Sequence, residues 1–205
     1  MQVRSRPAVV LGAVVGMIML AVALRMPPGT LEFLLLSIGL ALVWAVAGVL
    51  GARPAVGRTR APSAPRLALA GVLAGGALVL LFVLGALLVR WIPRLADPVS
   101  DLLAHGAAGA FWPVLGITVG NAVAEEIFFR GAVYAALPDR FAVVGTIVAY
   151  TVITAASGIW LLVLAGFLLG IVTTLQRRAT GGVLAPAVTH LVWSTSMLLF
   201  LPALV

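Results

Sequence analysis

The chain has 205 residues, of which 63% are hydrophobic and only 9% are charged, and its mean hydropathy is +1.22. A soluble domain of this size would have to expose much of that apolar surface to water, so the composition excludes the soluble globular classes. It predicts instead an all-α, polytopic bundle of helices that is integral to a membrane. The absence of cysteine excludes disulfides and a thiol nucleophile.

The net charge of +7 comes from 13 arginines, and the sequence contains no lysine. Strongly basic proteins often bind nucleic acid, but these arginines form no single basic face. They lie in short clusters between apolar runs, a pattern that is typical of membrane topology. We therefore expect membrane lipid, and no nucleic acid, as a partner of the chain.

Seven apolar runs approach the roughly 20 residues that a membrane-spanning helix needs. In chain order they occupy residues 8–24, 31–50, 67–89, 112–136, 141–157, 159–176 and 183–203, which predicts about seven transmembrane helices. The first run follows a basic start and contains an Ala-Val-Ala triplet, so a cleaved signal peptide is the alternative interpretation there. Its 17 apolar residues exceed the usual core of a signal peptide, and we expect an uncleaved first helix.

Residues 51–66 interrupt the apolar pattern. Their sequence, GARPAVGRTRAPSAPR, is rich in Pro, Gly, Ser and Arg, which predicts a flexible linker. It divides a two-helix membrane segment, residues 1–50, from a larger bundle, residues 67–205. Three pairs of glycines spaced four residues apart predict close contacts between helices in lipid; they are Gly12/Gly16, Gly71/Gly75 and Gly166/Gly170.

The distribution of the arginines predicts the orientation of the chain. If the N-terminus is cytoplasmic, nine arginines lie on the cytoplasmic side: Arg4, Arg6, Arg53, Arg58, Arg60, Arg66, Arg140, Arg177 and Arg178. Three lie outside, namely Arg25, Arg90 and Arg94, and Arg130 stays within a span. Basic residues concentrate in cytoplasmic loops, so we expect cytoplasmic loops at 51–66, 137–140 and 177–182. The expected location is a bacterial plasma membrane.

The fourth apolar run carries three ionisable side chains, in the stretch AVAEEIFFRG at 122–131. A charge at the centre of a bilayer costs on the order of 3 kcal/mol or more, so such residues usually face the bundle interior and find partners. Residues four apart lie on the same face of an α-helix, which places Asn121 over Glu125. By the same spacing, Glu126 lies over Arg130. We expect these two to form an ion pair, which leaves Glu125 without a local cation.

Two interpretations of these charges compete. In the first they are structural, an ion pair and one protonated carboxyl group that join neighbouring helices. In the second, Glu125 is a general base or a metal ligand, and the Glu126–Arg130 pair sets its geometry. The sequence favours the second interpretation only if another catalytic side chain lies nearby.

His190 is the candidate for that side chain. It lies in the last apolar run, and it is the only histidine that we expect at membrane depth, because His105 falls near an external helix end. A lone histidine in a helix is more often a packing residue than a catalytic one. If its helix neighbours the two glutamates, however, a carboxylate–imidazole site results, which is the minimum needed to activate a water with or without a metal.

These residues resemble the motifs of a known family. EEIFFRG at 125–131 is similar to the EExxxR motif of the CPBP family, which includes CAAX prenyl proteases and bacteriocin-processing (Abi) intramembrane peptidases. The family's later HxxxN/D motif follows a Gly…Thr-Gly…Pro…His stretch, and this resembles Gly170, Thr180-Gly181, Pro186 and His190. The resemblance covers about residues 112–200.

The resemblance implies an all-helical membrane protein that hydrolyses peptide bonds at a polar site within the bilayer, open toward the cytoplasm. It implies that Glu125 activates the attacking water. It also implies that Glu126 and Arg130 form the supporting pair, and that His190 is the histidine of the third motif.

Two positions depart from the family pattern. The second motif, FxxxH, aligns with ITAAS, so Ile153 stands for Phe and Ser157 for His. In the third motif Ser194 occupies the Asn/Asp position. A divalent metal such as zinc would therefore have only Glu125 and His190 as ligands, because a serine hydroxyl is a far poorer ligand than an imidazole.

Two functional hypotheses stay open. The first is an intramembrane endopeptidase that cleaves a peptide substrate through water activated by Glu125 and His190. Its polar support would come from Asn121, Ser157 and Ser194. The second is a relative that has lost hydrolysis and acts as an accessory or scaffold, binding a membrane protein partner or a lipid in the same cavity. A small transporter has less support, because the sequence shows neither an inverted repeat nor a second intramembrane charge cluster.

Overall fold

The computed structural model describes residues 4–27, 29–52, 63–89 and 110–200, and every element in these ranges is a helix. In chain order the elements are α1 (Arg6–Ala23), α2 (Leu31–Gly51), α3 (Ala64–Val89), α5 (Phe111–Glu125), the π-helix η1 (Glu126–Val133), α6 (Tyr134–Ala136), α7 (Asp139–Ala155), α8 (Trp160–Thr180) and α9 (Leu184–Phe200). The prediction of an all-α bundle is confirmed. Each of the seven apolar runs begins within three residues of a helix start.

Four of the described helices are long and apolar enough to cross a membrane, namely α1, α2, α3 and α8. α9 is a shorter apolar helix, and α5, η1 and α6 follow one another without a break. The outward-facing side chains are apolar, and Leu11, Leu73 and Leu80 are each exposed over about two-thirds of their surface. Water disfavours so much exposed leucine, whereas lipid accepts it. The bundle therefore presents a lipid-facing surface.

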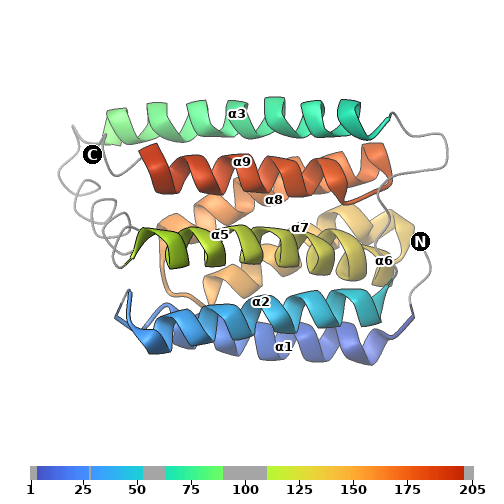
Figure 1. Ribbon diagram of the computed structural model, residues 1–205. Helices are drawn as coiled ribbons and strands as arrows, with labels where there is room; N and C mark the ends of the chain where they lie inside the picture. The colour runs from blue at the N-terminus through green and yellow to red at the C-terminus, as the bar shows by residue number, and fades with distance from the viewer. Residues whose placement is uncertain (1–3, 28, 53–62, 90–109, 201–205) are drawn as a thin grey trace.

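The helices run side by side, with α3 and α9 along one edge of the view in Figure 1 and α1 and α2 along the other. α5 lies between these pairs. The contacts agree with this view, because α3 packs on α9, α1 on α2 and α7 on α8, while the continuous α5–η1 segment contacts α2, α7, α8 and α9. The segment with the ionisable side chains is therefore the centre of the bundle.

Glycines let several of these helices approach closely. A Cβ atom on Gly71 would lie 2.6 Å from Cβ of Val188, and one on Gly75 would lie 2.8 Å from Cβ of Val192. The glycine pair on α8 faces α7 in the same way, and the pair on α1 faces α2 and η1. Because any side chain at these positions would hold the backbones apart, the packing role predicted for the three pairs is confirmed.

The two N-terminal helices pack directly on the central segment. Trp44 of α2 is 1% exposed, and its ring lies 6.5 Å from that of Phe128 and 5.7 Å from that of Phe129, both on η1. These aromatic side chains belong to one hydrophobic core that also includes residues of α1 and α7. Most of the predicted linker at 51–66, namely residues 53–62, lies outside the described residues.

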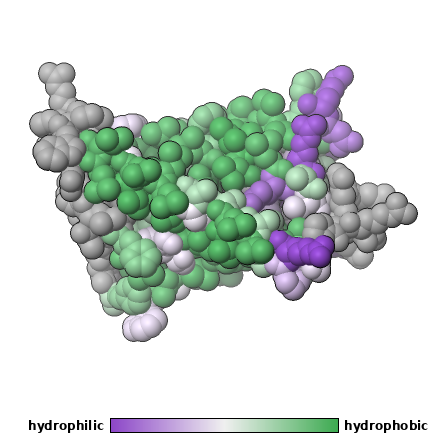
Figure 2. Space-filling view, turned by 90° about the horizontal axis from the view of Figure 1, so that it is seen from above, coloured by the Kyte–Doolittle hydropathy of each residue, from purple (hydrophilic) through white to green (hydrophobic). Residues whose placement is uncertain are grey.

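Hydrophilic surface gathers at one end of the bundle in the view of Figure 2. Exposed arginines lie at the starts of α1, α3 and α7 and at the end of α8, namely Arg6, Arg66, Arg140 and Arg178. The prediction of a loop at 177–182 is wrong in part, because α8 continues to Thr180 and Arg177 is 5% exposed in its last turn. The helix ends at Gly181, where a φ of 73° allows the left-handed cap that glycine adopts without strain.

Candidate active site

The EEIFFRG segment does not form the regular α-helix that the sequence predicts. Directly after α5, residues Glu126–Val133 form the π-helix η1, and α-helix resumes at Tyr134. The N–H of Tyr134 donates to the carbonyls of Gly131 and Phe129, and so skips the Arg130 carbonyl, which an α-helix would give it. Wide turns of this kind occur frequently at functional sites.

Arg177 of α8 stabilises the π-helix. Its Nε donates to the Arg130 carbonyl at 2.7 Å, so this backbone group has a partner in a buried place where it needs one. Its guanidinium also lies over the ring of Tyr134, with Cζ 4.9 Å from the ring centroid. From the sequence, Arg177 is interpreted only as one of the basic residues that indicate membrane topology. The structure shows that it also contacts the backbone of the EEIFFRG segment.

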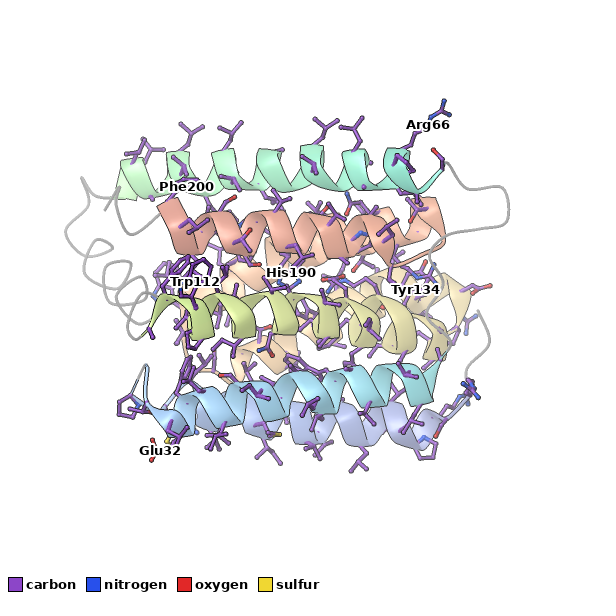
Figure 3. All side chains as sticks on the ribbon, in the orientation of Figure 1. Glu32, Arg66, Trp112, Tyr134, His190 and Phe200 are labelled. Atoms are coloured by element: carbon purple, nitrogen blue, oxygen red, sulfur yellow. The ribbon has the colours of Figure 1, made fainter. Side chains whose placement is uncertain are left out.

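The centre of the site is a buried ionic cluster on the carboxylate of Glu126. Its Oε1 lies 3.0 Å from Nη1 of Arg130 and 2.9 Å from Nδ1 of His190. Glu126 and Arg130 are 0% exposed and His190 is 5% exposed. His190 comes from α9 and lies between α9 and α5 in Figure 3, between the end marked by Arg66 and the end marked by Phe200.

The cluster contains the ion pair that the sequence predicts, but His190 has a different partner from the predicted one. The Glu126–Arg130 pair that the spacing predicts is present in the structure. The hydrogen bond of the imidazole, however, goes to Glu126, whereas the sequence predicts that His190 acts together with Glu125. Glu126 thus holds both a guanidinium and an imidazole, and charge-assisted hydrogen bonds of this kind are stronger than neutral ones.

Arg130 is fixed by several helices. Its Nη2 donates to the carbonyl of Gly170 on α8 at 3.4 Å. Its Cζ lies 4.5 Å from the centroid of the Tyr150 ring on α7, a distance at which a cation is attracted to the face of an aromatic ring. The guanidinium therefore joins η1, α7 and α8 around one buried charge.

Glu125 has a different partner from its neighbour. Its Oε2 accepts a hydrogen bond from the hydroxyl of Tyr150 at 2.6 Å. Its side chain is partly exposed, whereas that of Glu126 is sealed. His190 and Arg130 are near enough to interact with it electrostatically. The carboxyl group that the sequence left without a partner is thus held by a hydroxyl.

Residues 107–196 match a family model described as "Type II CAAX prenyl endopeptidase Rce1-like". The matched segment contains η1, Tyr150, Arg177 and His190. This part of the chain, a little under half of it, is similar to that family. A search of curated proteins found no match, and a search of solved structures found none. The family match and the apolar helices together show an integral membrane protein.

The two serines at motif positions of the matched segment form hydrogen bonds with backbone groups. Ser157, aligned with the histidine of the second motif, lies in the turn after α7 and accepts a hydrogen bond from the N–H of Ile159 at 3.2 Å. The hydroxyl of Ser194 donates to the carbonyl of His190 at 2.8 Å, within its own helix. Within the described residues, neither hydroxyl is hydrogen-bonded to a side chain of the ionic cluster.

Asn121 lies one turn before Glu125, where the spacing predicts it. Its Nδ2 donates to the carbonyl of Ile117 at 2.9 Å and to that of Ser37 on α2 at 3.2 Å. The second of these bonds crosses between helices, and Ser37 is buried. The amide therefore ties α5 to α2 and holds the helix that leads into the motif.

The donor atoms do not fit a zinc site. Zinc is usually held by at least three protein ligands, and no group of three His, Cys, Asp or Glu side chains in the described ranges could hold a metal ion. The oxygen that His190 contacts already pairs with Arg130, so a metal there would have to displace a cation. The predicted metal ligands, Glu125 and His190, offer two donors at most. His105 lies outside the described residues.

Sequence reasoning missed Tyr150 and Arg177, for different reasons. Tyr150 is one of two tyrosines in the chain and lies within an apolar run, where its hydroxyl needs a partner. A buried hydroxyl that needs a partner is a signal by which Tyr150 could have been identified as a candidate. Arg177 offered no such signal, because it stands next to Arg178 at the end of a span and reads as part of a basic loop.

Proposed function

We propose that the chain is an intramembrane endopeptidase in which Glu125 and His190 together hold and activate a water molecule. The observation that carries the proposal is the 2.9 Å contact between Nδ1 of His190 and Oε1 of Glu126. This contact supports hydrolysis because it occupies Nδ1 of the imidazole and leaves Nε2 available to a water molecule.

Glu126 selects the tautomer of His190. A carboxylate paired with Arg130 is ionised and can only accept hydrogen bonds, so the proton of the neutral imidazole lies on Nδ1. Nε2 then carries a lone pair, and no hydrogen bond from the described residues occupies it. Buried carboxylates orient histidine bases in hydrolases in the same way.

Glu125 supplies the second acceptor. Tyr150 occupies its Oε2, while Oε1 accepts no hydrogen bond from the described part of the chain, and the side chain is partly exposed. A water between Oε1 of Glu125 and Nε2 of His190 donates one hydrogen to each acceptor. Its oxygen lone pair is then directed at neither of them and is available to attack a carbonyl carbon.

The hydrolysis follows from this arrangement. Glu125 takes one proton of the water as the oxygen bonds to the scissile carbonyl carbon. The C–N bond then breaks, and Glu125 passes that proton to the leaving nitrogen, which departs as an amine. The second proton stays with the new carboxyl group. His190 orients the water, and the Glu126–Arg130 pair holds His190.

The charge distribution supports an orientation for this site. We place the end of the bundle that carries Arg6, Arg66, Arg140 and Arg178 in the cytoplasm, because basic residues concentrate there. The N-terminus is then cytoplasmic, in the plasma membrane of a bacterium. A substrate peptide within or next to the membrane would approach the glutamates from this side.

A second candidate function is favoured by the environment of Ser157. The hydroxyl that stands in place of the second-motif histidine is used inside the turn after α7, so it replaces none of the chemistry of an imidazole. A polar site with one histidine can still bind a polar group of a membrane protein partner or a lipid. In this role the chain is an accessory or scaffold without hydrolysis.

A cleavage assay distinguishes the two functions. Wild type and Glu125→Gln are reconstituted in lipid vesicles and assayed against prenylated CAAX peptides and leader peptides. We expect Glu125→Gln to lower kcat by about 10²–10⁴-fold, because it removes the general base. The matched control is Glu32→Gln, an exposed carboxylate at the start of α2, which should cleave like wild type.

Cleavage at background level by both wild type and Glu125→Gln would contradict the endopeptidase proposal. A stable membrane partner that copurifies equally with both proteins would then support the scaffold. Loss of activity in Glu32→Gln as well would mean that the substitutions act on folding, and it would remove the support for Glu125 as the base.

A further inference from the structure

We propose that Tyr150 is a positioning residue of this site, which fixes the carboxylate of Glu125 and so directs its second oxygen toward the water. This inference rests on the proposed function and names the part that α7 has in it. Ser157, the α7-side position suggested by the family pattern, lies in the turn beyond the helix, so the side chain that α7 contributes to the site is Tyr150.

The contact has the geometry of a charge-assisted hydrogen bond. The hydroxyl of Tyr150 lies 2.6 Å from Oε2 of Glu125. Bonds from O–H to an ionised oxygen measure about 2.5–2.7 Å, shorter than the usual O–H···O distance. The phenol therefore donates, the carboxylate accepts, and one of the two oxygens of Glu125 is fully engaged.

The ring of Tyr150 is held on several sides, so its hydroxyl is a fixed donor. Tyr150 is 5% exposed. Its ring centroid lies 4.8 Å from that of Phe129 in an edge-to-face arrangement, and the guanidinium of Arg130 covers it at 4.5 Å. Gly170 leaves room for it, since a Cβ there would lie 3.1 Å from Cδ1 of the tyrosine. Of Tyr150 and Glu125, only the glutamate side chain can still rotate to form the hydrogen bond.

As a consequence, the two oxygens of Glu125 have different roles: Oε2 binds Tyr150, and Oε1 binds the water. A free glutamate side chain rotates about several bonds, and ordering it costs conformational entropy. The hydrogen bond from Tyr150 orders the side chain before a substrate binds. Neighbouring residues preorganise catalytic groups in other sites in the same way. Oε1 is thereby presented to the water, and Tyr150 itself touches neither water nor substrate.

The test compares Tyr150→Phe with Tyr134→Phe. These are the two tyrosines of the chain, and each has an arginine over its ring, Arg130 over Tyr150 and Arg177 over Tyr134. Phenylalanine keeps the ring and the stacked cation in both variants. We expect Tyr150→Phe to lower kcat about tenfold to a hundredfold with KM unchanged, and to lower Tm because the hydrogen bond to Glu125 is lost. We expect Tyr134→Phe to retain wild-type kcat.

An infrared measurement tests the contact without any substrate. The carboxylate band that disappears in Glu125→Gln identifies Glu125, and we expect that band to shift in Tyr150→Phe and to stay in place in Tyr134→Phe. An unshifted band in Tyr150→Phe overturns the proposal, as does an unchanged kcat in an active preparation. If wild type itself shows no cleavage, the endopeptidase function fails, and the infrared band alone decides whether Tyr150 holds Glu125.

Discussion

Glu125 and Glu126 are neighbours in the chain, yet they lie in opposite surroundings. Glu126 is 0% exposed and shares one oxygen between Arg130 and His190. Glu125 is partly exposed, and a single hydroxyl, that of Tyr150, holds one of its oxygens. Glu126 is held by two partners on Oε1, and its Oε2 is buried without a hydrogen-bond partner in the described part of the chain. Glu125 keeps Oε1 free of hydrogen bonds from the described residues, on a side chain that is partly exposed.

The difference shows two ways of keeping a carboxyl group in a membrane protein. A fully buried carboxylate is tolerated when it is paired with a cation and hydrogen-bonded. A carboxylate at the edge of the same cluster needs fewer partners, because it retains some access to the surface. The π-helix begins between these two residues, so the change of helical geometry coincides with the change of role.

The largest expected effect comes from Glu126→Gln, compared with Glu125→Gln. Removing the charge of Glu126 leaves Arg130 as an uncompensated buried cation, which should cost about 3–5 kcal/mol of unfolding free energy. Glu125→Gln keeps an acceptor for Tyr150, and we expect a loss of about 1 kcal/mol. Thermal unfolding in detergent measures both.

The comparison also separates stability from activity. Glu125→Gln should retain the fold and lose cleavage, whereas Glu126→Gln should lose both. If the two variants had equal Tm values, the assignment of a structural role to Glu126 alone would be wrong.

The next effect tests the π-helix that begins between the two glutamates. Arg177→Met keeps an unbranched chain of similar length but removes the donor to the Arg130 carbonyl and the cation over Tyr134. An unpartnered buried carbonyl costs about 1–3 kcal/mol. Arg178→Met is the matched control, since Arg178 is the exposed neighbour on the same turn. Equal thermal stability of the two variants would show that Arg177 does not support the π-helix.

The sequence was sufficient for the fold because lipid imposes a simple rule on it. A span needs an unbroken apolar run, and each predicted run starts close to a helix start. The Glu126–Arg130 pair could also be predicted, because it is local and follows from a spacing of four residues. Long-range partners follow no such rule, and only His190 could be proposed among them, as the one histidine expected at membrane depth and as a match to the third motif of the family.

The rest of the site depends on contacts between helices far apart in sequence. Tyr150 meets Glu125 across 25 residues, and Arg177 meets the Arg130 carbonyl across 47. The hydroxyl and the guanidinium could each have bonded elsewhere, and only the packing of α7 and α8 on η1 selects these partners. The π-helix was unpredictable for the same reason, since its stabilising donor comes from another helix.

A smaller effect is expected from moving α9, which carries His190, relative to its neighbour α3. Gly75→Ala would place a Cβ 2.9 Å from the carbonyl of Thr189, the residue before His190. Overpacking of this kind costs about 1–3 kcal/mol. Gly76→Ala is the control, because a Cβ there meets nothing within 4 Å, and alanine in a helix should stabilise by up to about 1 kcal/mol. We expect opposite shifts of Tm, and shifts of the same sign would contradict the close packing.

The smallest effect is expected from Ser194→Ala. Within the described ranges, the hydroxyl of Ser194 bonds only to the carbonyl of His190, one turn earlier in the same helix, and such bonds contribute little to helix stability. We expect the unfolding free energy to change by less than about 0.5 kcal/mol and kcat by less than about twofold. If kcat fell tenfold with KM and Tm unchanged, Ser194 would act on the imidazole through its backbone, and Glu126 would no longer be sufficient to hold His190. An unchanged kcat would instead indicate that the carboxylate of Glu126 alone orients His190. This role distinguishes Glu126 from Glu125, the general base.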